Sequence, residues 1–147
     1  MQNEMRSMVR CQKVFKHPVN KVFEAFLNPV LLCQWYGPRY AEVGELFVEP
    51  VVGGRFDVEL ISERFGSLWT RGFFKEITQN RKLVYTFIFD PDLTAAGDSV
   101  VTVEFVERTE GTEVTVLQVL EKIIDPTGRT QGWIDLLDKL DEMLTAS

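Results

Sequence analysis

The sequence predicts an α+β fold in which a curved antiparallel sheet of six to seven strands wraps around one long C-terminal helix. Three observations lead to this prediction. Apolar and polar residues alternate through most of the chain up to residue 120, as in half-buried strands. Short turns join most of these segments, which favours antiparallel pairing. The last twenty or so residues instead repeat apolar side chains at three- and four-residue steps, which is typical of an amphipathic helix.

The first part of the chain predicts one strand and two short helices. Met8–Phe15 alternates as a strand, and Pro18 then suits the first turn of a helix because its missing N–H has no partner to lose there. The apolar face of this helix consists of Val19, Val22, Phe23 and Phe26. Asn28 and Pro29 begin a second short helix, which we expect to end near Gln34.

Six further strands are expected before the long helix. Lys82–Phe89 has the strongest strand pattern, and Gly72 interrupts the strand before it as a bulge or bend. We expect the first strand to pair with the last. The six predicted strands are Tyr40–Val48, Arg55–Ile61, Leu68–Ile77, Lys82–Phe89, Ser99–Glu107 and Thr112–Leu120.

The long helix is expected to run from Asp125 to Ala146. Asp125 is a suitable N-cap, and Pro126 follows at the first helical position. An apolar stripe at helical spacing needs a partner surface, and the only surface of that size is the sheet. The stripe consists of Trp133, Leu136, Leu137, Leu140, Met143 and Leu144.

Length and charge narrow the classes of function. A chain of 147 residues predicts a single domain, residues 1–147. The net charge of −6 and the lack of a basic cluster argue against nucleic acid and against anionic membrane surfaces as partners. No apolar run is long enough to span a membrane. The spacing of the two cysteines matches no metal-binding motif, and we expect both to be free thiols. We therefore expect a cytoplasmic protein without a metal or other cofactor.

The sequence contains no catalytic set, because the single histidine, His17, lies in a turn without an orienting partner. Polar residues on apolar strand faces are better candidates for a site, namely Arg71, Tyr85 and Gln118. A buried polar group needs a partner, which a ligand could supply. Two alternatives stay open: Tyr85 and Gln118 bond to each other or to backbone, and a bulge at Gly72 turns Arg71 to solvent. The predicted ligand-binding residues are Trp35, Phe56, Trp69, Arg71, Tyr85, Phe87, Phe105, Gln118 and Trp133.

Several motifs occur in an order that resembles a known family. They are Pro18–Phe26, Gln34–Pro38, Val52–Phe56, Arg71–Ile77, Lys82–Phe87 and Gly132-Trp133 before the leucine-rich helix. Together they resemble the START-like (SRPBCC) superfamily with its helix-grip, Bet v-type fold. Within it they resemble the bacterial proteins related to the activator of heat-shock-protein ATPase (AHSA1-like). This sequence departs from the family pattern at three places. It has Trp35-Tyr36 where relatives commonly have two Trp, and Gln118 stands near the position at which many relatives carry a His. The turn at Pro50–Gly54 is longer than the usual Pro-Gly-Gly.

The resemblance implies a cavity between the sheet and the long helix that suits an apolar or aromatic molecule. Binding of such a molecule is therefore the expected function, and enzymatic activity is not favoured. One alternative is a cyclase or hydrolase that acts on an aromatic or polyketide-type substrate. Another is a co-chaperone-like module that stimulates a heat-shock-protein ATPase in the stress response, although its eukaryotic counterparts carry a further domain. A homodimer also stays open, since Trp and Phe side chains beside the helix could form an exposed apolar patch.

Overall fold

The computed structural model describes residues 7–64, 66–90, 99–120 and 127–146. These residues form seven strands and three helices in the predicted order. Starting from the N-terminus, the elements are β1 (Ser7–Phe15), α1 (Val19–Ala25), α2 (Pro29–Trp35), β2 (Glu42–Val48), β3 (Arg55–Ser62), β4 (Gly66–Thr78), β5 (Lys82–Asp90), β6 (Ser99–Arg108), β7 (Gly111–Leu120) and α3 (Thr127–Ala146).

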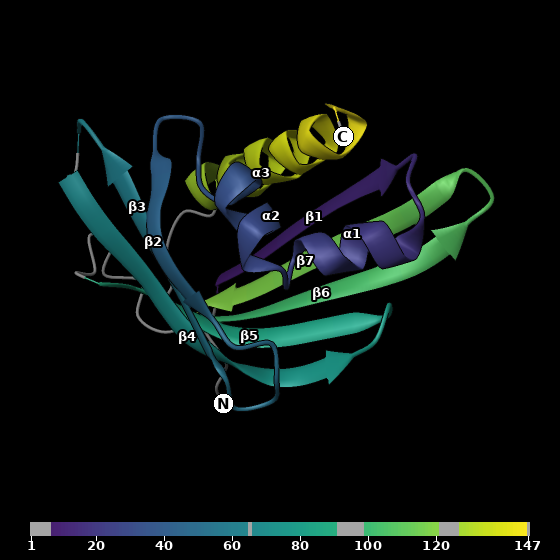
Figure 1. The fold of residues 1–147 in the computed structure, drawn as a ribbon, viewed down its shortest axis with the longest axis horizontal. Coiled ribbons are helices and arrows are strands. Elements are labelled where there is room, and N and C mark those ends of the chain that lie inside the picture. The colour runs from purple at the N-terminus through teal and green to yellow at the C-terminus, as the bar shows by residue number, and fades with distance from the viewer. Residues whose placement is uncertain (1–6, 65, 91–98, 121–126, 147) are drawn as a thin grey trace.

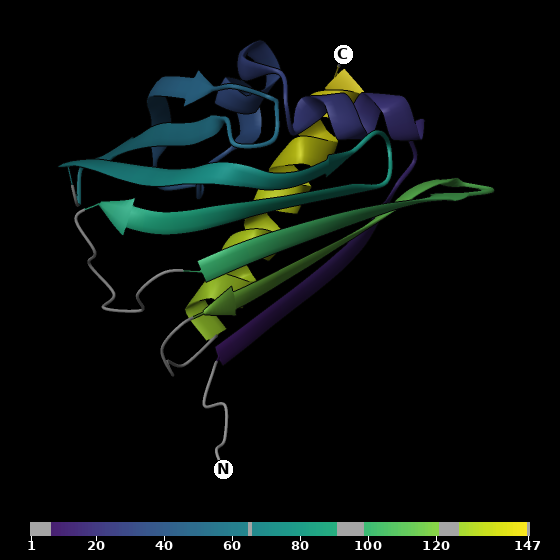
Figure 2. The ribbon, with the colours of Figure 1, turned by 90° about the horizontal axis from the view of Figure 1, so that it is seen from below.

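All strands belong to one antiparallel sheet in the order β1-β7-β6-β5-β4-β3-β2. The first strand pairs with the last, as the sequence predicts, and β2 forms the opposite edge. The sheet curves, and α3 crosses its concave side (Figure 1 and Figure 2). The helices α1 and α2 lie near the C-terminal end of α3 (Figure 2). The predicted helix-grip architecture is therefore confirmed.

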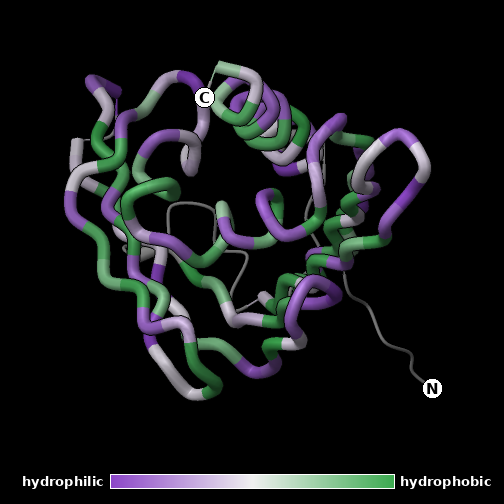
Figure 3. The backbone as a smooth tube through the Cα atoms, turned by 45° about the vertical axis from the view of Figure 1, so that its right-hand side comes forward, coloured by the Kyte–Doolittle hydropathy of each residue, from purple (hydrophilic) through white to green (hydrophobic). Residues whose placement is uncertain are grey.

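Alternation along the strands separates a buried inner face from an outer face. In β7, Thr112, Val114, Val116, Gln118 and Leu120 are buried, whereas the residues between them are half-buried. Hydrophobic and hydrophilic residues alternate along the strands in the same way (Figure 3). The inner face packs under α3, where the buried residues are Trp133, Leu137 and Leu140.

The helix boundaries follow from local capping chemistry. Pro18 precedes the first residue of α1, and the side chain of Asn28 accepts a hydrogen bond of 2.9 Å from the backbone N–H of Val30 at the start of α2. Such a cap satisfies one of the free donors at a helix start. The expected start of the long helix at Asp125 and Pro126 lies outside the described residues.

Two sequence predictions about the strands need correction. The second strand begins at Glu42 and not at Tyr40. Gly72 is not a bulge but a regular pair of Phe56, and a Cβ at this position would lie 1.8 Å from the carbonyl oxygen of Thr86. Only glycine permits so close an approach of two backbones. The register of β4 against β5 shifts further along, between Phe74 and Glu76.

Candidate ligand-binding site

Aromatic rings from both layers meet at the α1–α2 end of the concave face. Phe56 stacks on Tyr85 with ring centroids 4.7 Å apart and an interplanar angle of 17°, and Tyr36 meets Phe56 edge-on at 5.4 Å. Offset-stacked and edge-to-face arrangements are the favourable ones for aromatic rings. The connected rings are those of Phe23, Phe26, Trp35, Tyr36, Phe56, Phe74, Tyr85 and Phe105.

Two tyrosine hydroxyls lie within this aromatic cluster with no hydrogen-bond partner outside the pair. Tyr36 is 3% exposed and Tyr85 is 1% exposed, and neither hydroxyl has a partner in good hydrogen-bond geometry. Burial raises the pKa of both phenols, and a side-chain contact between the two hydroxyls raises the pKa of Tyr36 further and lowers that of Tyr85. The two hydroxyls are therefore protonated neighbours. An unpartnered buried hydroxyl costs about 1–3 kcal/mol, so this arrangement is unfavourable in the ligand-free protein.

A second polar cluster, in contrast, has all of its central groups paired. Gln118 accepts a hydrogen bond of 2.9 Å from the indole Nε1 of Trp133 on α3. Its amide Nε2 donates to the hydroxyl of Ser99 at 2.9 Å. That hydroxyl in turn donates to the backbone carbonyl of Phe87 at 2.8 Å. This relay joins α3 to three neighbouring strands through buried hydrogen bonds.

Strand register places the two polar clusters in one row of the inner face. Tyr85 is paired with Val101, and Val101 is paired with Gln118. Since adjacent strands are about 4.8 Å apart, Tyr85 and Gln118 are separated by roughly 10 Å along the sheet. They therefore do not bond to each other, and Gln118 finds its partners on α3 and β6 instead.

Most of the predicted site residues share the buried inner side of the fold, but Arg71 and Trp69 do not. Arg71 is paired with Asp57, and its guanidinium lies 4.6 Å from the centroid of the Trp69 ring on the outer face. The expected inward orientation of both side chains is therefore wrong. The buried residues are Trp35, Phe56, Tyr85, Phe87, Phe105, Gln118 and Trp133.

The outer face of β3 and β4 carries a cluster of its own. Asp57 is buried there, although alternation places it opposite the core, because two arginines cover it. Arg55 Nε donates to the Asp57 carboxylate at 2.9 Å, and Arg71 Nη1 lies 3.6 Å away. Charge pairing of this kind compensates the cost of burying a carboxylate.

Sequence reasoning missed Tyr36 and Ser99. Tyr36 follows the last residue of α2, where neither helical nor strand periodicity assigns a face. The sequence signal for its burial is the aromatic pair Trp35-Tyr36 before Gly37, because aromatic side chains contribute much of the buried surface of a core. Ser99 begins β6 in the same alternating set as Val101 and Val103, which indicates an inward hydroxyl.

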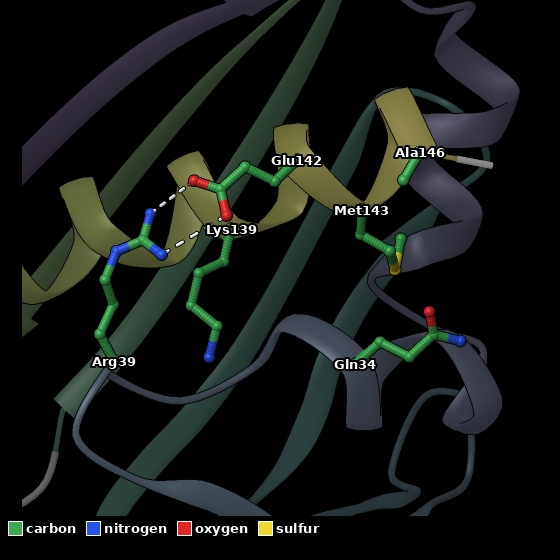
Figure 4. A pocket seen from close by; sticks show the side chains of 6 residues that line it. All are labelled: Gln34, Arg39, Lys139, Glu142, Met143 and Ala146. Carbon is green, nitrogen blue, oxygen red and sulfur yellow. Dashed lines mark hydrogen bonds and ion pairs between the residues drawn. The ribbon is translucent and has the colours of Figure 1, made fainter.

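A polar groove separates the α2–β2 connection from the last turns of α3 (Figure 4). Its volume is about 540 Å³, and the six side chains drawn in Figure 4 line it. Arg39 bonds Glu142 at 2.7 and 3.4 Å, and Lys139 donates to the Gly37 carbonyl at 2.9 Å. Burial lowers the pKa of Lys139. These contacts hold α3 against the segment that carries Tyr36.

Within the described ranges, no group of three His, Cys, Asp or Glu side chains is arranged to hold a metal ion. None of the helices in that part of the chain is long and apolar enough to cross a membrane.

Comparison with known proteins gives consistent results. The model of a family described as "Activator of Hsp90 ATPase homolog 1-like protein" matches residues 16–145. The crystal structure of protein CV1439 from Chromobacterium violaceum is similar with a TM-score of 0.81 and 26% identity, covering 93% of this chain and 96% of that one. No curated protein matches the chain.

Two further structures share the fold. The AHSA1-like protein from Aeromonas hydrophila has a TM-score of 0.79 and 20% identity, covering 95% of this chain and 93% of that one. DynU16, described as a putative protein in the dynemicin biosynthetic locus, has a TM-score of 0.77 and 18% identity. The similarity to DynU16 covers 98% of this chain and 48% of that one.

Proposed function

The chain belongs to the Activator of Hsp90 ATPase homolog 1-like family, and from that premise we propose that it binds an apolar or aromatic small molecule between the concave face of the sheet and α3. The observation that carries this proposal is the pair of buried hydroxyls on Tyr36 and Tyr85, which have no partner outside the pair and lie inside an aromatic wall. Ligand sites are typically lined by apolar and aromatic groups with a few polar groups that orient the ligand.

The contrast with the rest of the interior supports this reading. Gln118, Ser99 and Trp133 form a closed set of hydrogen bonds, so the fold is able to pair its buried polar groups. Native proteins leave few such groups unpaired. The two neighbouring exceptions, Tyr36 and Tyr85, are therefore the buried polar groups of the inner face that a ligand could pair.

The proposal is tested by native mass spectrometry of the protein purified from its own host, followed by solvent extraction. A stoichiometric apolar or aromatic molecule in the extract supports the proposal. As a second arm, the neutral fluorescent probe N-phenyl-1-naphthylamine is titrated into the purified protein. Absence of a bound molecule in the first arm and of saturable probe binding in the second would overturn the proposal.

Two phenylalanine substitutions on one strand localise the binding. Val101 lies on the inner face between the two polar clusters, whereas Val106 on the same strand is 44% exposed. Val101→Phe adds a ring to the inner face, so we expect it to weaken probe binding by tenfold or more. Val106→Phe is the matched control and should bind as the unmodified protein does. Equal binding by the two variants would place the probe elsewhere.

The family description favours a second candidate function, stimulation of a heat-shock-protein ATPase. This candidate is tested by measuring the ATPase rate of a purified chaperone of the ninety-kilodalton class with and without the protein. A concentration-dependent rise in rate supports it, and an unchanged rate excludes it. The third alternative, turnover of an aromatic substrate, would appear in the mass spectra as a product that differs in mass from the added compound.

A further inference from the structure

We propose that the hydroxyls of Tyr36 and Tyr85 form a two-donor site for the carbonyl oxygen of the bound molecule. The ligand class is then an aromatic or alicyclic ketone, and not a hydrocarbon. This inference rests on the proposed function, because it specifies the chemistry of the same interior site. It also gives a specific role to Tyr36, which lies outside the set of site residues predicted from the sequence.

The number and kind of hydrogen-bonding groups favour a carbonyl oxygen. A phenol hydroxyl carries one donor, and a carbonyl oxygen carries two lone pairs in one plane. Burial raises the pKa of both tyrosines, so both hydroxyls keep their proton at neutral pH and act as donors. The two hydroxyls lie close enough to contact each other and have no other partner, so one acceptor oxygen beside the pair would accept from both in place of that weak mutual contact.

The groups around the hydroxyls favour a neutral ligand with a ring. Phe56 contacts the rings of both tyrosines, Trp35 contacts Tyr36 at 5.5 Å, and Phe74 contacts Tyr85 at 6.0 Å. A carboxylate placed among these rings would lose its hydration, and two neutral hydroxyls compensate that loss only in part. A ketone carries no charge, and its apolar remainder gains from contact with the aromatic wall.

The two donors are held in place by contacts outside the pair. The indole of Trp35 donates to the Ala25 carbonyl at 3.0 Å and thereby fixes the ring that packs on Tyr36. Lys139 bonds the carbonyl of Gly37, the residue after Tyr36. Tyr85 lies in the middle of the sheet, paired with Phe74 and Val101. Donors fixed in this way need little reorganisation when the acceptor arrives.

The other polar group of the inner face is not available for this role. Gln118 already uses its amide oxygen for Trp133 and its amide nitrogen for Ser99. A ligand that displaced these partners would leave the buried indole N–H of Trp133 unpaired, at a cost similar to the gain. The geometry therefore assigns ligand orientation to the tyrosine pair and helix attachment to Gln118.

The test compares two probes that differ in one carbonyl group, acetophenone and ethylbenzene. Binding of each is measured by chemical-shift titration with the unmodified protein and with Tyr36→Phe, Tyr85→Phe and the exposed control Tyr40→Phe, since Tyr40 is 64% exposed. We expect acetophenone to bind about tenfold more tightly than ethylbenzene, a ratio typical of hydrogen bonds to a buried carbonyl. Either inner substitution should reduce the ratio severalfold, and Tyr40→Phe should not change it.

Infrared spectroscopy distinguishes a hydrogen bond to the ligand from a purely structural role of the tyrosines, because only the hydrogen bond changes the carbonyl stretching frequency. Hydrogen bonds from both hydroxyls should shift the carbonyl stretch of bound acetophenone to lower frequency, and the variant that combines Tyr36→Phe with Tyr85→Phe should reverse the shift. Equal binding of the two probes, or an unshifted stretch, would overturn the carbonyl inference and leave the proposed function standing. If neither probe binds and no molecule is recovered from the native protein, both proposals fail.

Discussion

The two polar clusters of the inner face differ in the pairing of their hydrogen-bonding groups. Both are buried and share one row of the sheet, roughly 10 Å apart. Gln118 is bonded on both sides, to Trp133 and Ser99, whereas the hydroxyls of Tyr36 and Tyr85 have no partner outside the pair. The comparison shows that burial of a polar residue does not define a site; its hydrogen-bond inventory does.

The difference follows from the geometry of the side chains. An amide offers two donors and two lone pairs, and a serine hydroxyl can rotate toward a nearby carbonyl. A phenol oxygen, in contrast, sits at the end of a rigid ring whose position is set by ring packing. Stacking on Phe56 fixes Tyr85, so its hydroxyl cannot turn toward a backbone carbonyl without losing that contact. Packing thus maintains the unpaired state.

The largest loss of stability is expected when the hydrogen bonds of Gln118 are removed. Gln118→Leu leaves the indole N–H of Trp133 unpaired and removes a partner of Ser99, so the free energy of unfolding should fall by about 2–4 kcal/mol. Urea unfolding followed by fluorescence measures this loss. Gln12→Leu is the matched control, because Gln12 is exposed and bonds only Thr115 at 3.0 Å among the contacts described. Equal losses for the two variants would contradict the structural role of Gln118.

The buried pair of Tyr36 and Tyr85 should make the folded protein less stable at alkaline pH. Burial raises the pKa of Tyr36 and Tyr85 above the ordinary value of 10.0. Their stabilising contribution is therefore complete below about pH 10 and is lost as the pH rises toward the folded-state pKa. In that window each tyrosine lowers the free energy of unfolding by about 1.4 kcal/mol per pH unit.

The measurement compares unfolding curves of the unmodified protein with those of Tyr36→Phe/Tyr85→Phe at neutral and alkaline pH. The double variant should lose stability less steeply above about pH 10. Tyr40→Phe, at an exposed position, serves as the control. Parallel pH profiles for all three proteins would refute the buried, protonated state of the pair.

At neutral pH we expect a smaller effect, which is a gain of stability and not a loss. Tyr85→Phe removes an unpartnered buried hydroxyl and keeps the ring that stacks on Phe56, so the ligand-free protein should gain about 1 kcal/mol of stability. Thermal unfolding of delipidated protein measures the gain. With a saturating ketone the order should reverse, because only the unmodified protein bonds the carbonyl through both hydroxyls. A destabilised ligand-free variant would indicate a partner inside the protein.

The smallest effect is expected at the groove beside α3. Arg39 and Glu142 are bonded to each other but are 50% and 64% exposed, so water and salt screen their attraction. Arg39→Ala should change the stability less than Gln118→Leu or Tyr85→Phe does, and the change should vanish in about 1 M salt. A large, salt-independent loss would show that this surface pair, and not the Gln118 relay, attaches α3.

Much of the architecture could be predicted because periodicity determines it. Alternation identified the strands, and the three- and four-residue spacing identified α3, so the strand count and the β1–β7 pairing are confirmed. Alternation divides a strand into two sets but does not say which set faces the helix. In β4, the set with Trp69, Arg71 and Phe73 has more ring surface than the set with Thr70 and Phe74, yet the latter faces inward.

The candidate site was predicted less completely than the fold. Tyr85, Gln118 and Trp133 are buried as expected, and their binding role stays a prediction. The partner of Gln118 could not be derived, because Trp133 approaches it from α3 through tertiary packing. Tyr36 was missed for the same reason: its proximity to Tyr85 results from how α2 packs on the sheet, and no local pattern encodes that distance.

The pairing of β1 with β7 has a consequence for synthesis on the ribosome. Val9 is paired with Gln118, a separation of more than one hundred residues. During translation β1 therefore has no strand to pair with until β7 has left the ribosome. The aromatic inner face stays exposed until α3 follows. Contacts between distant segments form slowly and leave apolar surface open to aggregation in the meantime. We expect the nascent chain to expose this apolar face until α3 has left the ribosome and packs against the sheet.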